Sequence, residues 1–425
     1  MRATDEVRRS VKQNFHLTNR HGIEESSGMK HSLTLCGLAV LLAACSNQPE
    51  SLNRSWNRKK AAAYLDRREA EWRAWPQAAR GQGTFCVSCH TALPYALARP
   101  VLTSTAGEQI ASVEERVLLE DVRQRVRLWP KDEPYYSSME QESRGTEAVL
   151  NALILADHDS LSGSMGADTR SAFDHMWATQ QSQGDNKGAW PWQVFNTQPW
   201  EAEDSLYYGA CLAAVAVGIA PENYRANPAI QDNLELLRQY LKGHYAAQTA
   251  VNRIGLIWAS QYLAGLITSE QQRSLIEEIV SKQQPDGGWS LSTLVGTWKR
   301  EDGTPLVLKS DGFATGYIAF VLQKAGLSND DHVRRGLSWL ASHQNWWNGG
   351  WSGYSLNKRR HNPFSQQSRF MDDAATAYAV LALTEARNAS SGQAMSASKR
   401  AEIPHSFLVR RIEPRISSQR SHSPW

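Results

Sequence analysis

Three copies of one short pattern constrain the fold of residues 135–390 more than any other feature of the sequence. In each copy a Gln-ended segment is followed by a tight turn that contains Gly and then Trp. Glycine permits the sharp turn that ends a helix, and proline and aspartate shape it. The copies are Gln180-Gln181…Gly188-Ala189-Trp190, Gln283-Gln284-Pro285-Asp286-Gly287-Gly288-Trp289 and Gln344-Asn345-Trp346-Trp347-Asn348-Gly349-Gly350-Trp351.

A second repeated feature accompanies the turns: a polar or acidic residue opens a segment of mostly small apolar residues. These segments begin roughly 50–60 residues apart, a spacing typical of repeated helix pairs. Because they are apolar nearly all round, we expect them to be inner helices, with charged segments such as 274–282 as outer helices. The residues that open them are Glu142, Asp204, Asn252, Asp311 and Asp372.

Together these features resemble the α/α toroid of terpenoid cyclases, a family that includes squalene-hopene cyclases. The stretch "QQPDGGW" at 283–289 is similar to the QW repeat of that family. The resemblance covers residues 135–390 and implies an all-α fold, an α/α toroid of helix-pair repeats. It also implies a pocket at one mouth of the barrel, ringed by the starts of the inner helices.

The resemblance does not carry an activity with it. Class II terpenoid cyclases use a DxDD motif, and this sequence has none. Protein prenyltransferase subunits share the toroid but need a zinc site of Asp, Cys and His, whereas Cys211 lies inside an apolar segment without such a pattern. Polysaccharide lyases also use toroids, with a cleft rich in Asn and Arg. One fold hosts several chemistries, so the site must decide between them.

Five acids at or before the inner-helix starts are the candidate catalytic residues. A carboxyl buried among aromatic side chains has the raised pKa that a general acid needs. Alternatively, an aspartate at a helix start is a cap that stabilises the positive helix end. Asp204 is the strongest candidate because two further acids crowd it. The five are Asp204, Glu201, Glu203, Asp311 and Asp372.

The stretch Cys86-Val87-Ser88-Cys89-His90 predicts a different kind of chemistry. In c-type haem attachment each thiol adds to a vinyl group, and the next histidine becomes an iron ligand. A zinc site would need two more ligands nearby, and a thioredoxin-like dithiol would need a βαβ context. A structural disulfide is a further alternative. We expect covalent haem c on Cys86 and Cys89, with His90 on the iron.

The haem motif sits in a segment, 56–130, that resembles a minimal class I cytochrome c: helix, CxxCH, loop, helix. Its expected helices lie within 56–79 and over Val113–Leu128. The sixth iron ligand is not marked by a motif. Met139 is the candidate, and the iron could also be five-coordinate. The alternatives to Met139 are Met165, His158 and His175.

The N-terminal region predicts where in the cell the protein is located. The apolar run at 33–44 is too short to span a bilayer, and it ends in Leu42-Ala43-Ala44-Cys45. It resembles a bacterial lipoprotein signal, which implies cleavage before Cys45, lipidation of its thiol and a location in the cell envelope, at the outer membrane facing the periplasm. An ordinary secretory signal or a buried helix are the alternatives.

These patterns divide the chain as follows. Segment 1–28 is a mis-assigned start or disordered, 29–44 is the signal peptide, 45–55 is a tether, 56–130 is the haem c segment, 135–390 is the toroid, and 391–425 is a disordered tail. A net charge of +3 gives no case for nucleic acid as a partner. Five cysteines are too few for a disulfide framework.

Three functions remain open at this stage. The first is a redox enzyme or redox-coupled binder of an apolar, terpenoid- or quinone-like molecule, which predicts a deep aromatic pocket beside the haem. The second is a non-catalytic electron-transfer cytochrome whose toroid serves as scaffold or partner-binding module, which predicts a filled barrel centre. The third is a carbohydrate site of the polysaccharide lyase kind, which predicts an open groove with Arg and Asn. The first two imply a redox partner protein.

Overall fold

The computed structural model describes residues 56–105, 110–129, 137–358, 362 and 365–401. The expected signal peptide, the tether and the lipidation candidate Cys45 lie outside the described residues. Within them the chain is helical, and the only extended pairings are two isolated bridges, Ala79–Phe85 and Thr197–Glu201. The described residues belong to one compact unit, 50–425.

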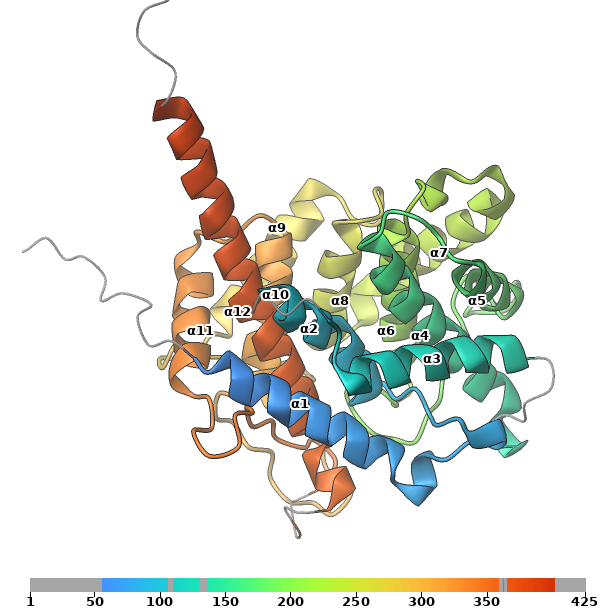
Figure 1. The fold of residues 1–425 in the computed structure, drawn as a ribbon, viewed down its shortest axis with the longest axis horizontal. Helices are drawn as coiled ribbons and strands as arrows, with labels where there is room; N and C mark the ends of the chain where they lie inside the picture. Colours follow the sequence, from blue (N-terminus) through green and yellow to red (C-terminus); the bar gives the residue numbers. More distant parts are fainter. Residues whose placement is uncertain (1–55, 106–109, 130–136, 359–361, 363–364, 402–425) are drawn as a thin grey trace, which may run out of the picture. The chain divides into compact units, whose positions relative to one another are not determined.

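Twelve α-helices make up the described part of the chain (Figure 1). In chain order they are α1 (Arg58–Arg73), α2 (Ala92–Thr105), α3 (Val113–Leu128), α4 (Glu140–Ser160), α5 (Ala167–Ala178), α6 (Ser205–Ile219), α7 (Gln231–His244), α8 (Ala250–Ser260), α9 (Ser269–Ser281), α10 (Gly312–Lys324), α11 (Asp331–Ser342) and α12 (Gln366–Ala401). None of these helices is long and apolar enough to cross a bilayer.

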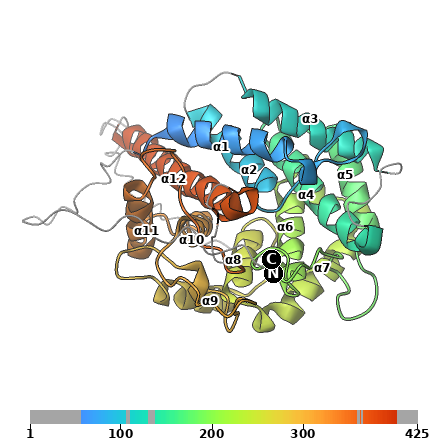
Figure 2. The same ribbon diagram turned by 90° about the horizontal axis from the view of Figure 1, so that it is seen from below.

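Six helices form a closed inner ring. α4 packs on α6, α6 on α8, α8 on α10 and α10 on α12, and α12 then packs on α2, which packs on α4. The other six, α1, α3, α5, α7, α9 and α11, lie outside this ring, each against inner helices (Figure 2). The fold is therefore the expected all-α toroid, built from six pairs of one outer and one inner helix.

The sequence of each helix explains its layer. In α6 the residues from Tyr207 to Val217 are all buried, because small apolar side chains cover every face of the helix. In α11 the buried residues recur at helical spacing and leave the opposite face to solvent. The buried positions of α11 are Val333, Gly336, Leu337, Trp339 and Leu340.

The three Gly-Trp turns make the same contacts, which confirms that they are repeats. In each, the indole Nε1 donates to a carbonyl near the end of the preceding outer helix: Trp190 to Met176 (2.6 Å), Trp289 to Ile279 (2.9 Å) and Trp351 to Leu340 (2.8 Å). In each, a glutamine Nε2 also reaches the start of the next outer helix: Gln180 to the carbonyl of Asn233, Gln283 to that of His332 and Gln344 to that of Asn57.

The third of these glutamine contacts closes the ring. Asn57 caps α1, so α1 occupies the place of the outer helix that follows α11. The expected boundary between a haem segment at 56–130 and a toroid at 135–390 consequently does not separate two packing units. The helices of the first segment are the elements that complete the toroid, because the apolar side of α2 is buried between α12 and α4.

The C-terminal part of the chain also differs from expectation. α12 continues as a helix to Ala401, so the first part of the stretch 391–425, expected to be disordered, is helical. Residues 402–425 lie outside the described residues.

Close packing between α10 and α12 predicts a matched pair of substitutions. An added Cβ at Gly316 in α10 would lie 2.6 Å from the backbone nitrogen of Ala379, whereas at Gly243 in α7 no atom lies within 4 Å. We expect Gly316→Ala to lower the free energy of unfolding by about 1–3 kcal/mol. Gly243→Ala should raise it by about 0.5–1 kcal/mol, because alanine favours the helix. Urea denaturation measures the free energy of unfolding of both variants. An equal change in the two variants would contradict the close packing of α10 on α12.

Candidate functional site

The CxxCH motif lies directly before an inner helix, since α2 begins two residues after His90. The Ser88 hydroxyl accepts hydrogen bonds from the backbone nitrogens of Thr91 (3.2 Å) and Ala92 (3.0 Å), which starts the helix. The indole of Trp72 donates to the carbonyl of Cys86 at 2.7 Å. The motif is therefore fixed to both α1 and α2.

A pocket of about 170 Å³ opens at this motif, where the starts of four inner helices converge. Its walls combine aromatic side chains with polar ones. The lining residues are Trp72, Trp75, Gln77, Arg80, Cys86, Val87, Ser88, Cys89, His90, Thr146, Gln193, Phe195, Glu201 and Phe370. All three chemically active side chains of the motif thus face one space.

Both thiols of the motif are free; Cys86 is half-buried and Cys89 is buried. Burial raises the pKa of each thiol, so both stay protonated at neutral pH. A redox-active dithiol needs a lowered thiol pKa, so a thioredoxin-like role gains no support. The described residues contain no group of three or more His, Cys, Asp or Glu placed to hold a bare metal ion.

The His90 ring is enclosed by aromatic side chains and is only 7% exposed. It stacks on Phe370 with ring centroids 3.6 Å apart and 16° between the planes, and the edge of Trp72 meets it at 5.0 Å. Burial, and then the positive charge of Arg68, lower the pKa of His90 to about 3. The imidazole is therefore neutral at physiological pH.

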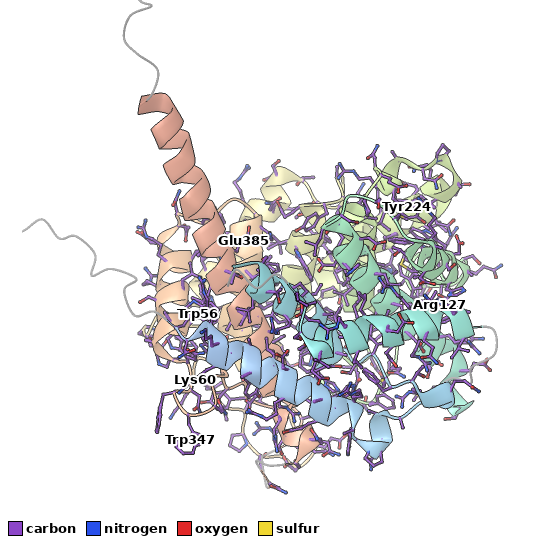
Figure 3. The ribbon with its side chains drawn as sticks, viewed as in Figure 1. Trp56, Lys60, Arg127, Tyr224, Trp347 and Glu385 are labelled. Carbon is purple, nitrogen blue, oxygen red and sulfur yellow. The ribbon has the colours of Figure 1, made fainter. Side chains whose placement is uncertain are left out.

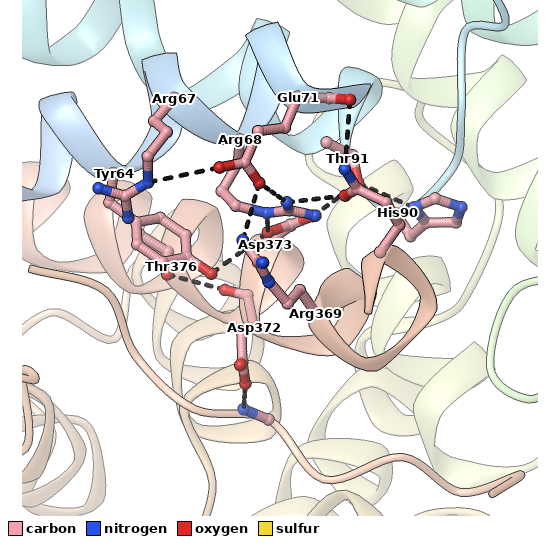
Figure 4. A network of polar contacts seen from close by, with 12 residues as sticks. Tyr64, Arg67, Arg68, Glu71, His90, Thr91, Arg369, Asp372, Asp373 and Thr376 are labelled. Atoms are coloured by element: carbon pink, nitrogen blue, oxygen red, sulfur yellow. Dashed lines mark hydrogen bonds and ion pairs between the residues drawn. The ribbon is translucent and has the colours of Figure 1, made fainter. Parts of the chain in front are cut away.

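A chain of hydrogen bonds fixes which ring nitrogen of His90 carries the proton (Figure 4). The Thr91 hydroxyl donates to the Asp373 carboxylate at 2.8 Å, and so its oxygen accepts from His90 Nδ1 at 2.9 Å. With the proton on Nδ1, Nε2 keeps its lone pair. A metal-ligating histidine has this same arrangement, in which the other ring nitrogen is tied to a carboxylate or carbonyl.

Asp373 is itself held by an ion pair between α1 and α12 (Figure 4). The Arg68 guanidinium donates twice, from Nε at 2.6 Å and Nη2 at 3.0 Å, and the Tyr64 hydroxyl donates at 3.2 Å. Burial raises the pKa of Asp373, while the bonds to Arg68, Thr91 and Tyr64 lower it. Because arginine stays charged, the pair is ionic.

Two further buried carboxyls lie behind the motif. Glu69 is 1% exposed and neither of its carboxyl oxygens has a hydrogen-bond partner. Burial, and then the nearby charge of Asp121, raise the pKa of Glu69 to about 8. Burial likewise raises the pKa of Asp121 to about 7, and its Oδ1 accepts from the backbone nitrogen of Phe85 at 2.9 Å. These acids are outside the set expected from the sequence.

Of the five expected catalytic acids, only Glu201 lines the pocket. Thr197 donates to it at 3.1 Å, and burial raises its pKa. The Asp204 carboxylate accepts hydrogen bonds from the side-chain amides of Gln198 (2.6 Å) and Asn252 (3.0 Å). Glu203 is exposed.

The carboxylates of the other two acids accept hydrogen bonds from backbone nitrogens. Asp311 caps α10, accepting from the nitrogens of Ala314 (2.9 Å) and Leu291 (2.7 Å), and burial raises its pKa to about 7. Asp372 accepts from the nitrogen of Gly353 at 2.9 Å. The alternative interpretation as caps and turn anchors therefore describes Asp311 and Asp372 better than a catalytic role.

The sixth-ligand candidate Met139 lies in a short 3-10 turn, Ser137–Met139, before α4. It does not line the pocket, and neither do Met165, His158 or His175. Side chains that the sequence analysis did not single out, Phe370, Thr91 and Asp373, surround His90 instead. The sequence signal for Asp373 was its place beside Asp372 in a helix start.

Aromatic side chains of the neighbouring inner helices α8, α10 and α12 pack against one another. Tyr317 packs against Tyr378 with centroids 4.8 Å apart, and Phe313 lies 5.5 Å from Tyr378 and 5.8 Å from Tyr317. Trp258 meets the edge of Tyr317 at 6.5 Å. A larger cavity, of about 380 Å³, lies elsewhere, between α2, α3 and α4.

Comparison with known proteins adds little beyond the fold. No family model matches the sequence, and no curated protein matches it. Among solved structures, the GH76A alpha-1,6-mannanase from Salegentibacter sp. is similar at 12% identity and a TM-score of 0.46, and the type II terpene cyclase MstE from Scytonema at 14% and 0.40. Each alignment covers 78% of this chain and 99% of the other. Likenesses this weak carry no weight for function.

The buried carboxyl of Glu69 predicts a pH-dependent stability. Below pH 4.5 the side chain is protonated in both the folded and the unfolded state. Between pH 4.5 and about 8 only the unfolded state ionises, so stability falls as pH rises, by up to about 5 kcal/mol. Urea denaturation should show that Glu69→Gln is more stable than wild type at pH 8 and that this advantage disappears at pH 4. The exposed Glu270→Gln should follow wild type, and an E69Q advantage equal at both pH values would contradict the assignment.

Proposed function

We propose that this chain is a c-type haem protein, with haem bound covalently to Cys86 and Cys89 and with His90 Nε2 as its axial ligand. The observation that carries the proposal is that both thiols and the imidazole line one pocket while Nδ1 is tied to a carboxylate through Thr91. That arrangement leaves a lone pair on Nε2, which is what an iron ligand requires.

The chemistry of the donor set fits this group. In attachment each neutral thiol adds across a vinyl group: a sulfur–carbon bond forms, the double bond becomes single, and the thiol hydrogen goes to the other vinyl carbon. The reaction has no net oxidation or reduction. The pocket, at about 170 Å³, is smaller than the roughly 300–1,000 Å³ of enclosed small-molecule sites, so haem would enter it only in part and would extend beyond the mouth of the barrel.

The role we propose is one-electron transfer, with the toroid as scaffold. Haem supplies one-electron redox chemistry when bound. The chain accepts one electron from a reduced partner protein and gives it to an oxidised one. The aromatic packing among α8, α10 and α12 supports this role over a deep substrate pocket in the toroid. Trp72, Trp200 and Phe370 shield His90 from water, and Arg68 and Asp373 hold its orientation.

The proposed location of the protein in the cell rests on the sequence alone. The lipobox-like stretch 42–45 supports export and a lipid anchor at Cys45, at the outer membrane facing the periplasm. Haem c is attached outside the bacterial cytoplasm, so the signal and the CxxCH motif agree with each other.

A second candidate is a redox-coupled binder of an apolar molecule. The cavity of about 380 Å³ between α2, α3 and α4 favours it, because its size falls in the range of ligand sites and its walls include Tyr95, Leu118, Leu119 and Ile154. A quinone-like molecule there would be held on the helix that follows the haem motif.

Haem attachment has a direct test. The chain from Met29, produced in a bacterium with haem c maturation, should give a c-type pyridine haemochrome spectrum and retain haem in denaturing gels. Cys86→Ala/Cys89→Ala should lose the covalent haem, because no thiol remains to add to a vinyl group. Cys211→Ala, which removes a buried thiol from α6, should keep it. Wild-type protein without haem, under conditions that mature a control cytochrome, would refute the proposal.

The hydrogen bond between His90 and Thr91 should affect the midpoint potential of the haem. Thr91→Val removes the link from His90 to Asp373 and so makes the imidazole a weaker electron donor. We expect covalent haem to be retained and the midpoint potential, measured by spectroscopic redox titration, to rise. Thr384→Val is the matched control, because this buried threonine of α12 bonds only its own helix. An unchanged potential in T91V would rule out the orienting role of the chain of hydrogen bonds.

A further inference from the structure

Two adjacent tryptophans stand out on the surface. Trp346 and Trp347 are 76% and 77% exposed, the most exposed large hydrophobic side chains among the described residues. They lie in the third Gly-Trp turn. The other two turns form with the same backbone contacts but carry Asn186-Lys187 or Pro285-Asp286 before the glycine. The turn therefore does not need these two indoles, and their exposure calls for another explanation.

The indoles are displayed by a fixed loop. Lys60 Nζ donates to the carbonyl of Trp346 at 2.6 Å, and the backbone nitrogen of Asn57 donates to Gln344 Oε1 at 2.6 Å. Figure 3 shows Trp347 near Lys60 and the start of α1. The Asn345 side chain accepts from the nitrogen of Trp347 at 2.9 Å. The two rings meet edge to face, 5.4 Å apart at 85°, so they form no flat platform on which a sugar ring could stack.

Positive charge lies at the start of α1, which contacts the loop that carries the indoles. The start of α1 contributes Arg58, Lys59 and Lys60, of which the two lysines are exposed. Neither of the two segments that build this surface, 56–65 and 341–358, contains an Asp or Glu. Exposed tryptophan beside lysine and arginine is the combination found where proteins meet the headgroup region of an anionic bilayer.

We propose that these residues, Trp346, Trp347, Arg58, Lys59 and Lys60, form a docking patch for the surface of an anionic lipid bilayer. The inference stands without the haem. The described chain begins at Trp56, beside the patch, and the eleven residues from Cys45 reach at most about 40 Å. A chain anchored there has the patch within reach of the same membrane.

The patch and the CxxCH pocket lie at opposite ends of α1. The helix begins with the basic residues of the patch and ends beside Trp72 and Trp75, which line the pocket, so its sixteen residues separate the two by about 24 Å. Docking through the patch would consequently leave the pocket open to a partner protein, as electron transfer between proteins requires.

Vesicle co-sedimentation tests the patch apart from the lipid anchor. The chain from Ser46 contains the whole compact unit 50–425 but not the lipidation candidate. It should bind vesicles of phosphatidylethanolamine and phosphatidylglycerol at low salt, and bind phosphatidylcholine vesicles at least tenfold more weakly. Lys59→Gln, which leaves the bond from Lys60 to the loop intact, should lower the partition coefficient about fivefold, equivalent to about 1 kcal/mol.

The tryptophans have a matched control. Trp346→Ser/Trp347→Ser should lower partitioning at least tenfold, whereas Ile110→Ser/Leu161→Ser, which removes two equally exposed apolar side chains from other surfaces, should leave it unchanged. The proposal is overturned if wild type ignores anionic vesicles, or if the control pair reduces binding as much as the tryptophan pair. It is also overturned if the tryptophans instead drive self-association in sedimentation velocity, or retention by soluble mannan, without vesicle binding.

Discussion

The buried ion pair between Arg68 and Asp373 is the interaction on which both the ring and the site depend. It joins α1 to α12 across 305 positions of sequence, and the same carboxylate accepts from Thr91, which holds His90. A buried carboxylate is tolerable only when its hydrogen bonds are filled, and removal of one partner of such a pair typically costs about 3–5 kcal/mol. Closure of the toroid and orientation of the imidazole therefore depend on the same carboxylate.

Closure from the N-terminal side explains why the CxxCH motif lies at the mouth of the barrel. The outer helix α1 fills the place after α11, and α2 then enters the ring between α12 and α4. The connection between α1 and α2 has to cross the end of the ring where the other inner helices begin. The CxxCH motif is that connection, so its side chains meet Glu201, Phe195 and Phe370 from the neighbouring starts.

The repeats could be predicted because their signals are local. Each Gly-Trp turn carries its own glycine and indole, the apolar character of α6 shows its burial, and α3 has the bounds expected from Val113–Leu128. α2 could not be anticipated in this way, since Pro94 and Pro100 argue against a helix. Pro94 lies in the first turn, where its missing N–H costs nothing, and tertiary packing accommodates Pro100.

The part of the site that consists of residues close together in sequence could be predicted. Cys86, Cys89 and His90 form a motif, and the structure brings them to one pocket. Asp373 could not be separated from Asp372 by sequence, because neighbours in a helix point about 100° apart and the ring's register decides which one faces α1. The same limit applies to the acids at helix starts, where a cap and a catalytic group have the same local sequence.

The aromatic packing of the inner helices and the polar chain around His90 have a common physical consequence. Trp200 lies 6.1 Å from His90 and 5.4 Å from Phe313, so aromatic contacts run from the imidazole into the packed core. A close-packed interior transmits strain and resists rearrangement, and it excludes the water that would otherwise reorient around a changing charge. On the other side, the ion pair fixes the only hydrogen bond that His90 makes through Nδ1. A group held at this mouth would be bounded by rigid packing on one side and by a fixed chain of hydrogen bonds on the other, so its surroundings would change little when its charge changed.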